Sequence, residues 1–342
     1  METYKIIPKN WTAYCHKYEI GKTYKVTGEL KPRENGFNSC KELIDCYNFY
    51  NNLYGTSHVC IAKVPDNPED FIEKQLVNKR IISREITILK ELSQEEIESI
   101  LIKEINSKDD IKLQCLILET LVSQQKLSVS FLKQFKNKLD FKKVIVYQLL
   151  SEDFIEEIIE DLKNKDEDLE DYLIDICRCQ DLSEDFIRKF SIKKFSDRWF
   201  WYYISMHQKL SEDFIREFKD KVYWQGICMN QKLSESFIRE FKNELGLEYI
   251  STYQELSESF IREFKDEWNW SYISKFQKLS EDFIEEFKDR VDWHNIYVFQ
   301  ILSPNFAQKY KNKINFSLVI EQRRQKAEIT KKRKKELICT IY

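Results

Sequence analysis

The chain has 342 residues, of which 42% are hydrophobic and 14% aromatic, and this much apolar material excludes an intrinsically disordered protein. Its 55 basic and 58 acidic residues give a net charge of −3, which excludes an overall electrostatic preference for nucleic acid or an anionic membrane. No apolar stretch reaches the roughly 18–20 residues of a membrane span, and nine scattered cysteines without a signal peptide predict reduced thiols in the cytoplasm.

Residues 1–91 predict a small α+β domain. Short runs rich in β-branched and aromatic residues at 24–27, 59–62 and 86–89 are typical of strands, and residues 40–54 have the apolar spacing of a helix. Most of the glycines and prolines fall before residue 69, so the turn-forming residues of the chain are concentrated in this domain.

This domain also contains most of the residues that could bind a metal or carry out catalysis. They are Cys15, His16, Cys40, Cys46, His58 and Cys60. Their spacing lacks the two close cysteine pairs of a zinc site, so we expect no metal and interpret them as small buried cysteines and surface histidines. No glycine-rich phosphate loop, zinc-protease helix or serine-nucleophile motif occurs, and we predict no enzymatic activity and no cofactor.

Part of the N-terminal region resembles a known family. Residues 14–24, the box Gly36-Phe37-Asn38-Ser39-Cys40 and the apolar run at 43–50 resemble a small domain of unknown function found in phage and giant-virus proteins. That family carries a Gly-Phe-His-x-Cys box, and this chain has Asn38 at the position of its histidine. The resemblance implies a viral source and implies no activity.

From about residue 92 to residue 324 the sequence repeats. The dipeptide Leu-Ser opens nine copies, at residues 92, 127, 150, 182, 210, 233, 256, 279 and 302. The spacing is a constant 23 residues from Leu210 onward and is 35, 23, 32 and 28 residues before it. A fixed period of this length predicts an α-solenoid of short two-helix repeats, so the whole chain is mainly α. The array also resembles the 23-residue helical repeats of giant-virus proteins.

Each copy predicts two helices. The serine after the leucine is a helix N-cap, followed by acidic residues that suit the positive end of the helix dipole. Phe214, Ile215 and Phe218 then share one face of a first helix of about ten residues. We expect no complete capping box, because phenylalanine occupies the third position after serine. Trp224 and Ile227 mark the second helix.

A glutamine occupies the penultimate position of the copies, from Gln125 to Gln300. The favoured interpretation is that its amide satisfies backbone groups where one repeat meets the next. The alternative is an exposed ladder of glutamines that binds a repetitive ligand.

The second helices vary between copies, whereas the serine, the apolar face and the glutamine are nearly constant. Because a repeat protein keeps its framework and varies its recognition surface, we predict that the variable positions contact a protein partner. They are Gln225, Met229, Glu248, Tyr249, Thr252, Ser271, Tyr272, Lys275, His294, Asn295 and Val298.

Residues 325–342 form a basic tail that contains Lys331, Lys332, Arg333, Lys334 and Lys335. The favoured interpretation is a solvated helical end of the array, and the alternatives are a nuclear-import signal and a nucleic-acid contact. We expect nucleic acid to bind only here, if at all.

The sequence therefore predicts a non-enzymatic scaffold or adaptor that binds protein partners in the cytoplasm, which is the host cytoplasm if the source is viral. The first alternative is a self-assembling structural protein of a viral particle. The second is a small enzyme in the N-terminal domain, for example a group transferase using His16 and a nearby tyrosine or glutamate, with the repeats as its targeting arm.

Overall fold

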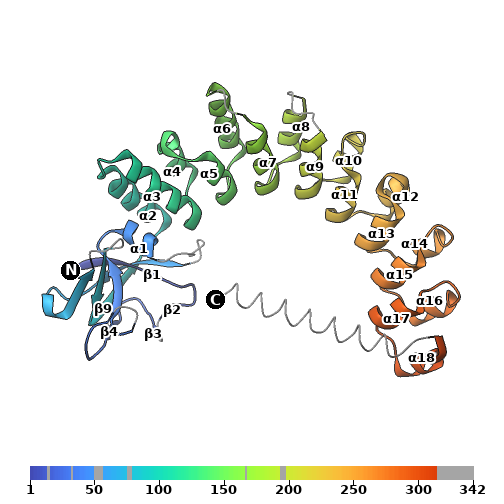
Figure 1. Cartoon of the computed structure of the whole chain (residues 1–342), viewed down its shortest axis with the longest axis horizontal. Helices are drawn as coiled ribbons and strands as arrows, with labels where there is room; N and C mark the ends of the chain where they lie inside the picture. Colours follow the sequence, from blue (N-terminus) through green and yellow to red (C-terminus); the bar gives the residue numbers. More distant parts are fainter. Residues whose placement is uncertain are drawn as a thin grey trace. The chain divides into compact units, whose positions relative to one another are not determined.

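A computed structural model of the chain is mainly helical, with eighteen α-helices among the described residues and a β-rich N-terminal region (Figure 1). The structure describes residues 1–13, 16–31, 34–49, 57–74, 79–165, 168–192 and 198–313. Cys15 and the five basic tail residues from Lys331 to Lys335 lie outside this part. The chain divides into two compact units, Met1–Leu182 and Ser183–Tyr342.

Seven strands of the first unit form one antiparallel sheet in the order β4-β9-β6-β1-β5-β8-β7. A separate two-stranded sheet pairs β2 with β3. The bounds are β1 Glu2–Ile7, β2 Thr12–Ala13, β3 His16–Lys17, β4 Thr23–Lys25, β5 Phe37–Cys40, β6 His58–Lys63, β7 Phe71–Lys74, β8 Arg80–Ser83 and β9 Glu85–Glu91. The three predicted strands are confirmed as β4, β6 and β9, and the prediction missed the others.

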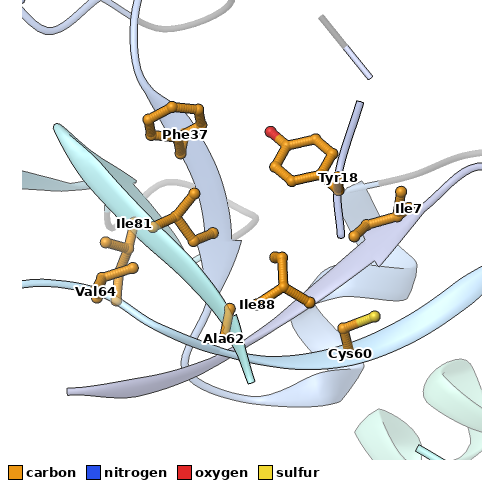
Figure 2. Close-up of a cluster of buried hydrophobic side chains, with 9 residues drawn as sticks. Ile7, Tyr18, Phe37, Cys60, Ala62, Val64, Ile81 and Ile88 are labelled. Carbon is orange, nitrogen blue, oxygen red and sulfur yellow. The ribbon is translucent and has the colours of Figure 1, made fainter. Parts of the chain in front are cut away.

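The two faces of the sheet pack against different partners. Figure 2 shows the buried cluster on one face, where side chains of β1, β5, β6, β8 and β9 meet Tyr18. The other face packs against α1 (Leu43–Phe49), whose Cys46 thiol donates to the Tyr4 carbonyl at 3.2 Å. The helix was predicted from residue 40, but it begins at Leu43 because Cys40 pairs with Tyr4 in the sheet.

The first helix of the array anchors this small domain within the first unit. Glu104 of α2 (Gln94–Asn106) accepts hydrogen bonds from the Leu43 and Ile44 amides at 2.8 and 2.9 Å, which satisfies free donors at the start of α1. Burial raises the pKa of the Glu104 carboxyl group above its usual value. Lys108, just after α2, forms an ion pair with Glu42 at 2.7 Å.

The remaining helices come in pairs along each unit. In the first unit they are α3 Ile111–Gln124, α4 Val129–Gln134, α5 Phe141–Tyr147, α6 Glu152–Asn164 and α7 Glu170–Cys179. In the second they are α8 Glu184–Ile192, α9 Arg198–His207, α10 Glu212–Glu217, α11 Trp224–Asn230, α12 Glu235–Leu245, α13 Leu247–Tyr253, α14 Glu258–Glu263, α15 Trp270–Phe276, α16 Glu281–Glu286, α17 Trp293–Phe299 and α18 Pro304–Lys309. No helix of the described part is long and apolar enough to cross a membrane.

The serine caps are confirmed. Each of the nine serines accepts a hydrogen bond from the amide three residues later, as Ser211 does from Phe214 at 3.1 Å. The prediction that no capping box is complete was wrong for the first copy, where Glu96 replaces the usual phenylalanine and binds back to the Ser93 amide. Several first helices are also shorter than the predicted ten residues, because the backbone of Phe218 and its counterparts leaves the helical region.

The glutamines join neighbouring repeats, which confirms their structural interpretation. Gln254 is buried; its side-chain oxygen accepts from the Leu233 amide at 3.1 Å, and its nitrogen donates to the Cys228 and Gln231 carbonyls. The same three bonds occur at Gln148, Gln180, Gln277 and Gln300. Because the amides are occupied by the backbone, these buried glutamines cannot act as an exposed ladder.

Charged residues join the first helices of successive repeats. The Glu212 carboxylate accepts from the Ser234 amide at 2.6 Å, 22 residues away. The Arg216 guanidinium donates to Glu240 at 2.9 Å, 24 residues away, and lies 4.9 Å from the centre of the Phe237 ring. Each residue thus pairs with the neighbouring repeat at a spacing close to the 23-residue period.

The second helices pack side by side within each unit. Figure 1 shows α9, α11, α13, α15 and α17 along the inner edge of the second unit and α10, α12, α14 and α16 along its outer edge. Small buried residues allow the close approach: a Cβ added to Gly226 would lie 2.9 Å from the Tyr223 side chain and 3.1 Å from that of Met206. Successive second helices therefore present one face to the neighbouring repeat and another to solvent.

Candidate partner-binding surface

The predicted partner-binding residues lie on α11, α13, α15 and α17 of the second unit. Ten of the eleven are partly or fully exposed, and Met229, Glu248, Ser271 and Lys275 are the most open of them. Val298 is the exception, and the prediction for it was wrong. Its side chain is only 7% exposed, so it is buried and does not belong to a free surface.

Several of these variable residues bind one another across neighbouring repeats. The Asn295 amide donates to the Ser271 carbonyl and hydroxyl at 3.1 and 2.9 Å, and that hydroxyl donates to Asp292. The Tyr272 hydroxyl donates to Glu248 at 2.5 Å, and this bond to a carboxylate raises the pKa of Tyr272. Much of the variation at these positions therefore reflects contacts between repeats, which leaves fewer side chains for a partner.

Large aromatic residues that the sequence analysis missed extend this surface. Tyr253 is 48% exposed and Phe276 is 40% exposed, each three residues after the buried isoleucine of its helix. Tyr202 of α9 is also 40% exposed. We call Tyr202, Tyr249, Tyr253, Tyr272 and Phe276 the aromatic row.

Helical geometry explains why these residues belong together. Tyr253 follows Tyr249 by four residues and Phe276 follows Tyr272 by four, so each pair lies on one side of its helix. The ring centres are 6.2 and 6.0 Å apart, and the Lys275 ammonium lies 4.8 Å from the centre of the Phe276 ring. Counting four residues on from each predicted tyrosine would have found Tyr253 and Phe276 in the sequence.

The row borders a hollow between α9 and α11. Its volume is about 710 Å³, and its lining includes Arg198, Trp201, Tyr202, Lys221, Tyr223 and Gln225. The Tyr202 and Tyr223 rings are 5.0 Å apart. The lining also contains the acidic Asp220, so aromatic faces lie next to two basic residues, one acidic residue and one predicted partner residue.

The candidate metal ligands of the N-terminal domain have structural roles. Cys40, Cys46 and Cys60 are buried, and burial raises the pKa of the Cys60 thiol to about 12, so it stays protonated. The histidines were predicted to be surface residues, but both are partly buried. His58 stacks on Trp11 at 4.1 Å and bonds to Glu91, while the His16 ring lies 5.2 Å from that of Phe37. Among the described residues, no three or more His, Cys, Asp or Glu side chains are grouped for a metal ion.

Comparison with protein families identifies the N-terminal region. Residues 1–100 match the model of a domain of unknown function (DUF7666). The match agrees with the predicted domain of unknown function and extends past residue 91 into α2. No curated protein and no solved structure matches the chain.

Proposed function

We propose that this protein is a non-enzymatic scaffold or adaptor whose helical pairs form an α-solenoid that binds a protein partner. The observation that carries the proposal is the aromatic row, in which the rings of Tyr202, Tyr253 and Phe276 are exposed along the second helices of one unit. Tyrosine, phenylalanine and methionine are enriched at the centres of protein interfaces, where they contribute most of the binding energy.

The regular links between repeats support the solenoid. From Leu210 onward, the glutamine, glutamate and arginine contacts between repeats recur at spacings of 21 to 26 residues. A helical pair of this size cannot bury both of its apolar faces alone, so each pair depends on its neighbours.

The test of the partner surface replaces aromatic rings with charged side chains and leaves the contacts between repeats unchanged. Tyr253→Glu and Phe276→Glu together place two charges where a partner would bury aromatic rings. The matched control is Glu244→Lys, an exposed change at the end of α12 that makes a comparable change in charge. Point changes are preferable to removing residues 1–90, because Glu104 binds the start of α1.

The readout is affinity purification of each tagged chain from the cells that make it, followed by mass spectrometry and by binding measurements with the purified partner. We expect the control to retain a specific partner and the double variant to weaken it at least tenfold. Equal binding by the wild type and the double variant would refute the aromatic row as the interface.

One observation favours self-assembly as a second candidate. Ile301 is 98% exposed and Leu149 is 69% exposed, each directly after the conserved glutamine, where most copies carry a charged residue. Isolated exposed apolar residues are common on monomers, but two at one repeat position suit contact between copies. Sedimentation of Ile301→Lys with Leu149→Lys tests this candidate: loss of a concentration-dependent assembly supports it, and a wild type that stays monomeric excludes it.

The proposal also includes the cellular compartment of the protein. We place the protein in the cytoplasm, the host cytoplasm if the source is viral, with nuclear import through the basic tail as the alternative. Fluorescence microscopy of tagged chains with and without residues 325–342 distinguishes the two.

A further inference from the structure

A lysine side chain lies inside the N-terminal domain. Lys5 of β1 is 1% exposed and is paired across the sheet with Cys60. Its ammonium donates to the Asn38 carbonyl at 2.8 Å and lies 5.0 Å from the centre of the Tyr18 ring. No carboxylate of the described residues forms an ion pair with it.

This environment disfavours the charged form of the amine. An ammonium carries three donors, and the described residues give it one hydrogen-bond acceptor. A buried charge without a counter-ion is costly, so the group loses its proton more readily. Burial accordingly lowers the pKa of Lys5 to about 8.

The amine borders a small cavity of about 60 Å³. The lining includes Lys5, His16, Tyr18, Phe37 and Asn38, and one acidic residue, Glu34, which forms no ion pair with Lys5. Figure 2 shows Tyr18 and Phe37 on the same face of the sheet. This space is larger than one water molecule needs but admits only a molecule of a few non-hydrogen atoms.

The cavity lining also contains a residue that must be glycine. Gly36 has a φ of +121°, and a Cβ there would lie 2.5 Å from the Ile82 side chain. Glycine at this position therefore lets the backbone at the start of β5 lie close to β8 beside the cavity.

We propose that Lys5 is a nucleophilic amine that forms an imine with a small aldehyde or ketone admitted by this cavity. A desolvated lysine that is partly neutral near pH 7 is the usual protein nucleophile for carbonyl carbon. This inference concerns the N-terminal domain and does not depend on the proposed scaffold function.

The reaction is a condensation that releases water. The lone pair of the neutral Lys5 nitrogen adds to the carbonyl carbon, and the carbonyl oxygen takes up a proton to give a carbinolamine. The nitrogen then forms a double bond to that carbon, and the oxygen leaves as water with the two amine hydrogens. His16 and Glu34, which line the same cavity, are the groups placed to give a proton to the departing oxygen and to take one from the nitrogen.

Reductive trapping of the full chain tests the proposal. The probe is acetaldehyde with sodium cyanoborohydride at pH 7, which converts an imine to a stable ethylamine that peptide mass spectrometry locates. The neutral fraction of Lys5 is roughly 300-fold larger than that of a lysine with the ordinary pKa. We expect Lys5 to be ethylated at least tenfold faster than the exposed Lys9 and Lys17.

Two controls accompany this experiment: an aldehyde that is too large for the cavity, and a variant that lacks the Lys5 amine. Benzaldehyde exceeds the cavity, so it should label Lys9 and Lys17 but leave Lys5 unmodified. Lys5→Arg should remove the acetaldehyde label, and fragment spectra distinguish Lys5 from the reactive amino group of Met1. The proposal fails if acetaldehyde modifies Lys9 and Lys17 but not Lys5, or if Lys5 reacts equally with both aldehydes.

Discussion

Lys5 and Gln254 are both buried polar residues, but they differ in how well their hydrogen-bonding groups are satisfied. Gln254 makes three hydrogen bonds to backbone groups of its own and the preceding repeat, whereas Lys5 makes one, to the Asn38 carbonyl. A satisfied buried amide stabilises the fold, and an under-satisfied buried charge destabilises it. The two residues should therefore respond in opposite ways to substitution and to pH.

The first prediction concerns the pH dependence of stability. The pKa of Lys5 is lowered in the folded chain to about 8, so between pH 8 and about 10.4 the unfolded chain binds a proton that the folded chain does not. This group therefore raises the free energy of unfolding as the pH increases, by up to about 1.4 kcal/mol per pH unit. The free energy of unfolding of the wild type should therefore rise relative to that of Lys5→Met across this interval.

The comparison with Lys5→Met is needed because other groups act in the opposite direction. Burial raises the pKa of Cys60 to about 12, which makes stability fall as the pH increases. The charge of Lys5 lowers that pKa, so this fall is present in both chains and is no weaker in Lys5→Met. Trp11 is the only tryptophan of Met1–Leu182, so fluorine NMR of fluorotryptophan-labelled protein in urea follows this unit. A difference between the chains that does not change from pH 8 to 10 would contradict the lowered pKa.

The second prediction concerns the glutamine links. Gln254→Ala leaves the Leu233 amide and two carbonyls without their partner, so it should cost about 2–4 kcal/mol of stability. The control is Gln225→Ala on α11, where the half-exposed side chain makes no such link and the cost should stay below about 0.5 kcal/mol. Urea unfolding followed by tryptophan fluorescence reports on Ser183–Tyr342, which holds six of the seven tryptophans. Similar costs for the two variants would refute this role.

At the scale of single elements, the first helices of the repeats depend on their surroundings. The helices α10, α14 and α16 have six residues each, far fewer than the roughly 12–15 that an isolated helix needs in water. Each is held by a serine cap at its start and by buried phenylalanine and isoleucine side chains along one face.

The third prediction concerns the serine cap. The Ser280 hydroxyl accepts from the Phe283 amide at 3.2 Å, so Ser280→Ala should lower the stability of the second unit by about 1 kcal/mol. Ser280→Asp keeps an oxygen acceptor at the cap and should restore most of the loss. Urea unfolding measures both variants, and hydrogen exchange of the α16 amides localises the effect. If the alanine and aspartate variants are equally unstable, the cap is not the cause.

At the scale of the whole molecule, positive charge is concentrated at the end of the sequence. Residues 325–342 contain six basic and two acidic residues, so the rest of the chain carries a net charge of −7. Polyanion binding depends on local positive charge and weakens as salt is added.

The fourth prediction follows from this asymmetry. The full chain should be retained on heparin at low salt and elute as the salt concentration rises, whereas a chain ending at residue 324 should pass through. Gel filtration of both chains checks that the truncated protein keeps its size. Equal retention would mean that another basic surface binds the polyanion.

Much of the local structure could be predicted from the sequence, because the repeat aligns equivalent positions. The caps and the buried glutamines follow from the recurrence of the same residues in successive copies, which shows which positions stay constant. The strands β1, β5, β7 and β8 were missed because they are short or lack strict alternation of apolar and polar residues, as where Lys5 interrupts the apolar pattern of β1.

Two kinds of feature were decided only by the tertiary structure. Whether a variable residue of a second helix faces solvent depends on its surroundings in the fold. Val298 is buried and Asn295 binds Ser271 of the neighbouring repeat, whereas Tyr253 and Phe276 are open. The cavity at Lys5 forms where residues far apart in the sequence meet across the sheet. The sequence by itself determines the repeat period and the helix caps, because these depend on residues close together in the chain. The burial and charge state of a side chain depend on residues that the fold brings together from distant parts of the chain.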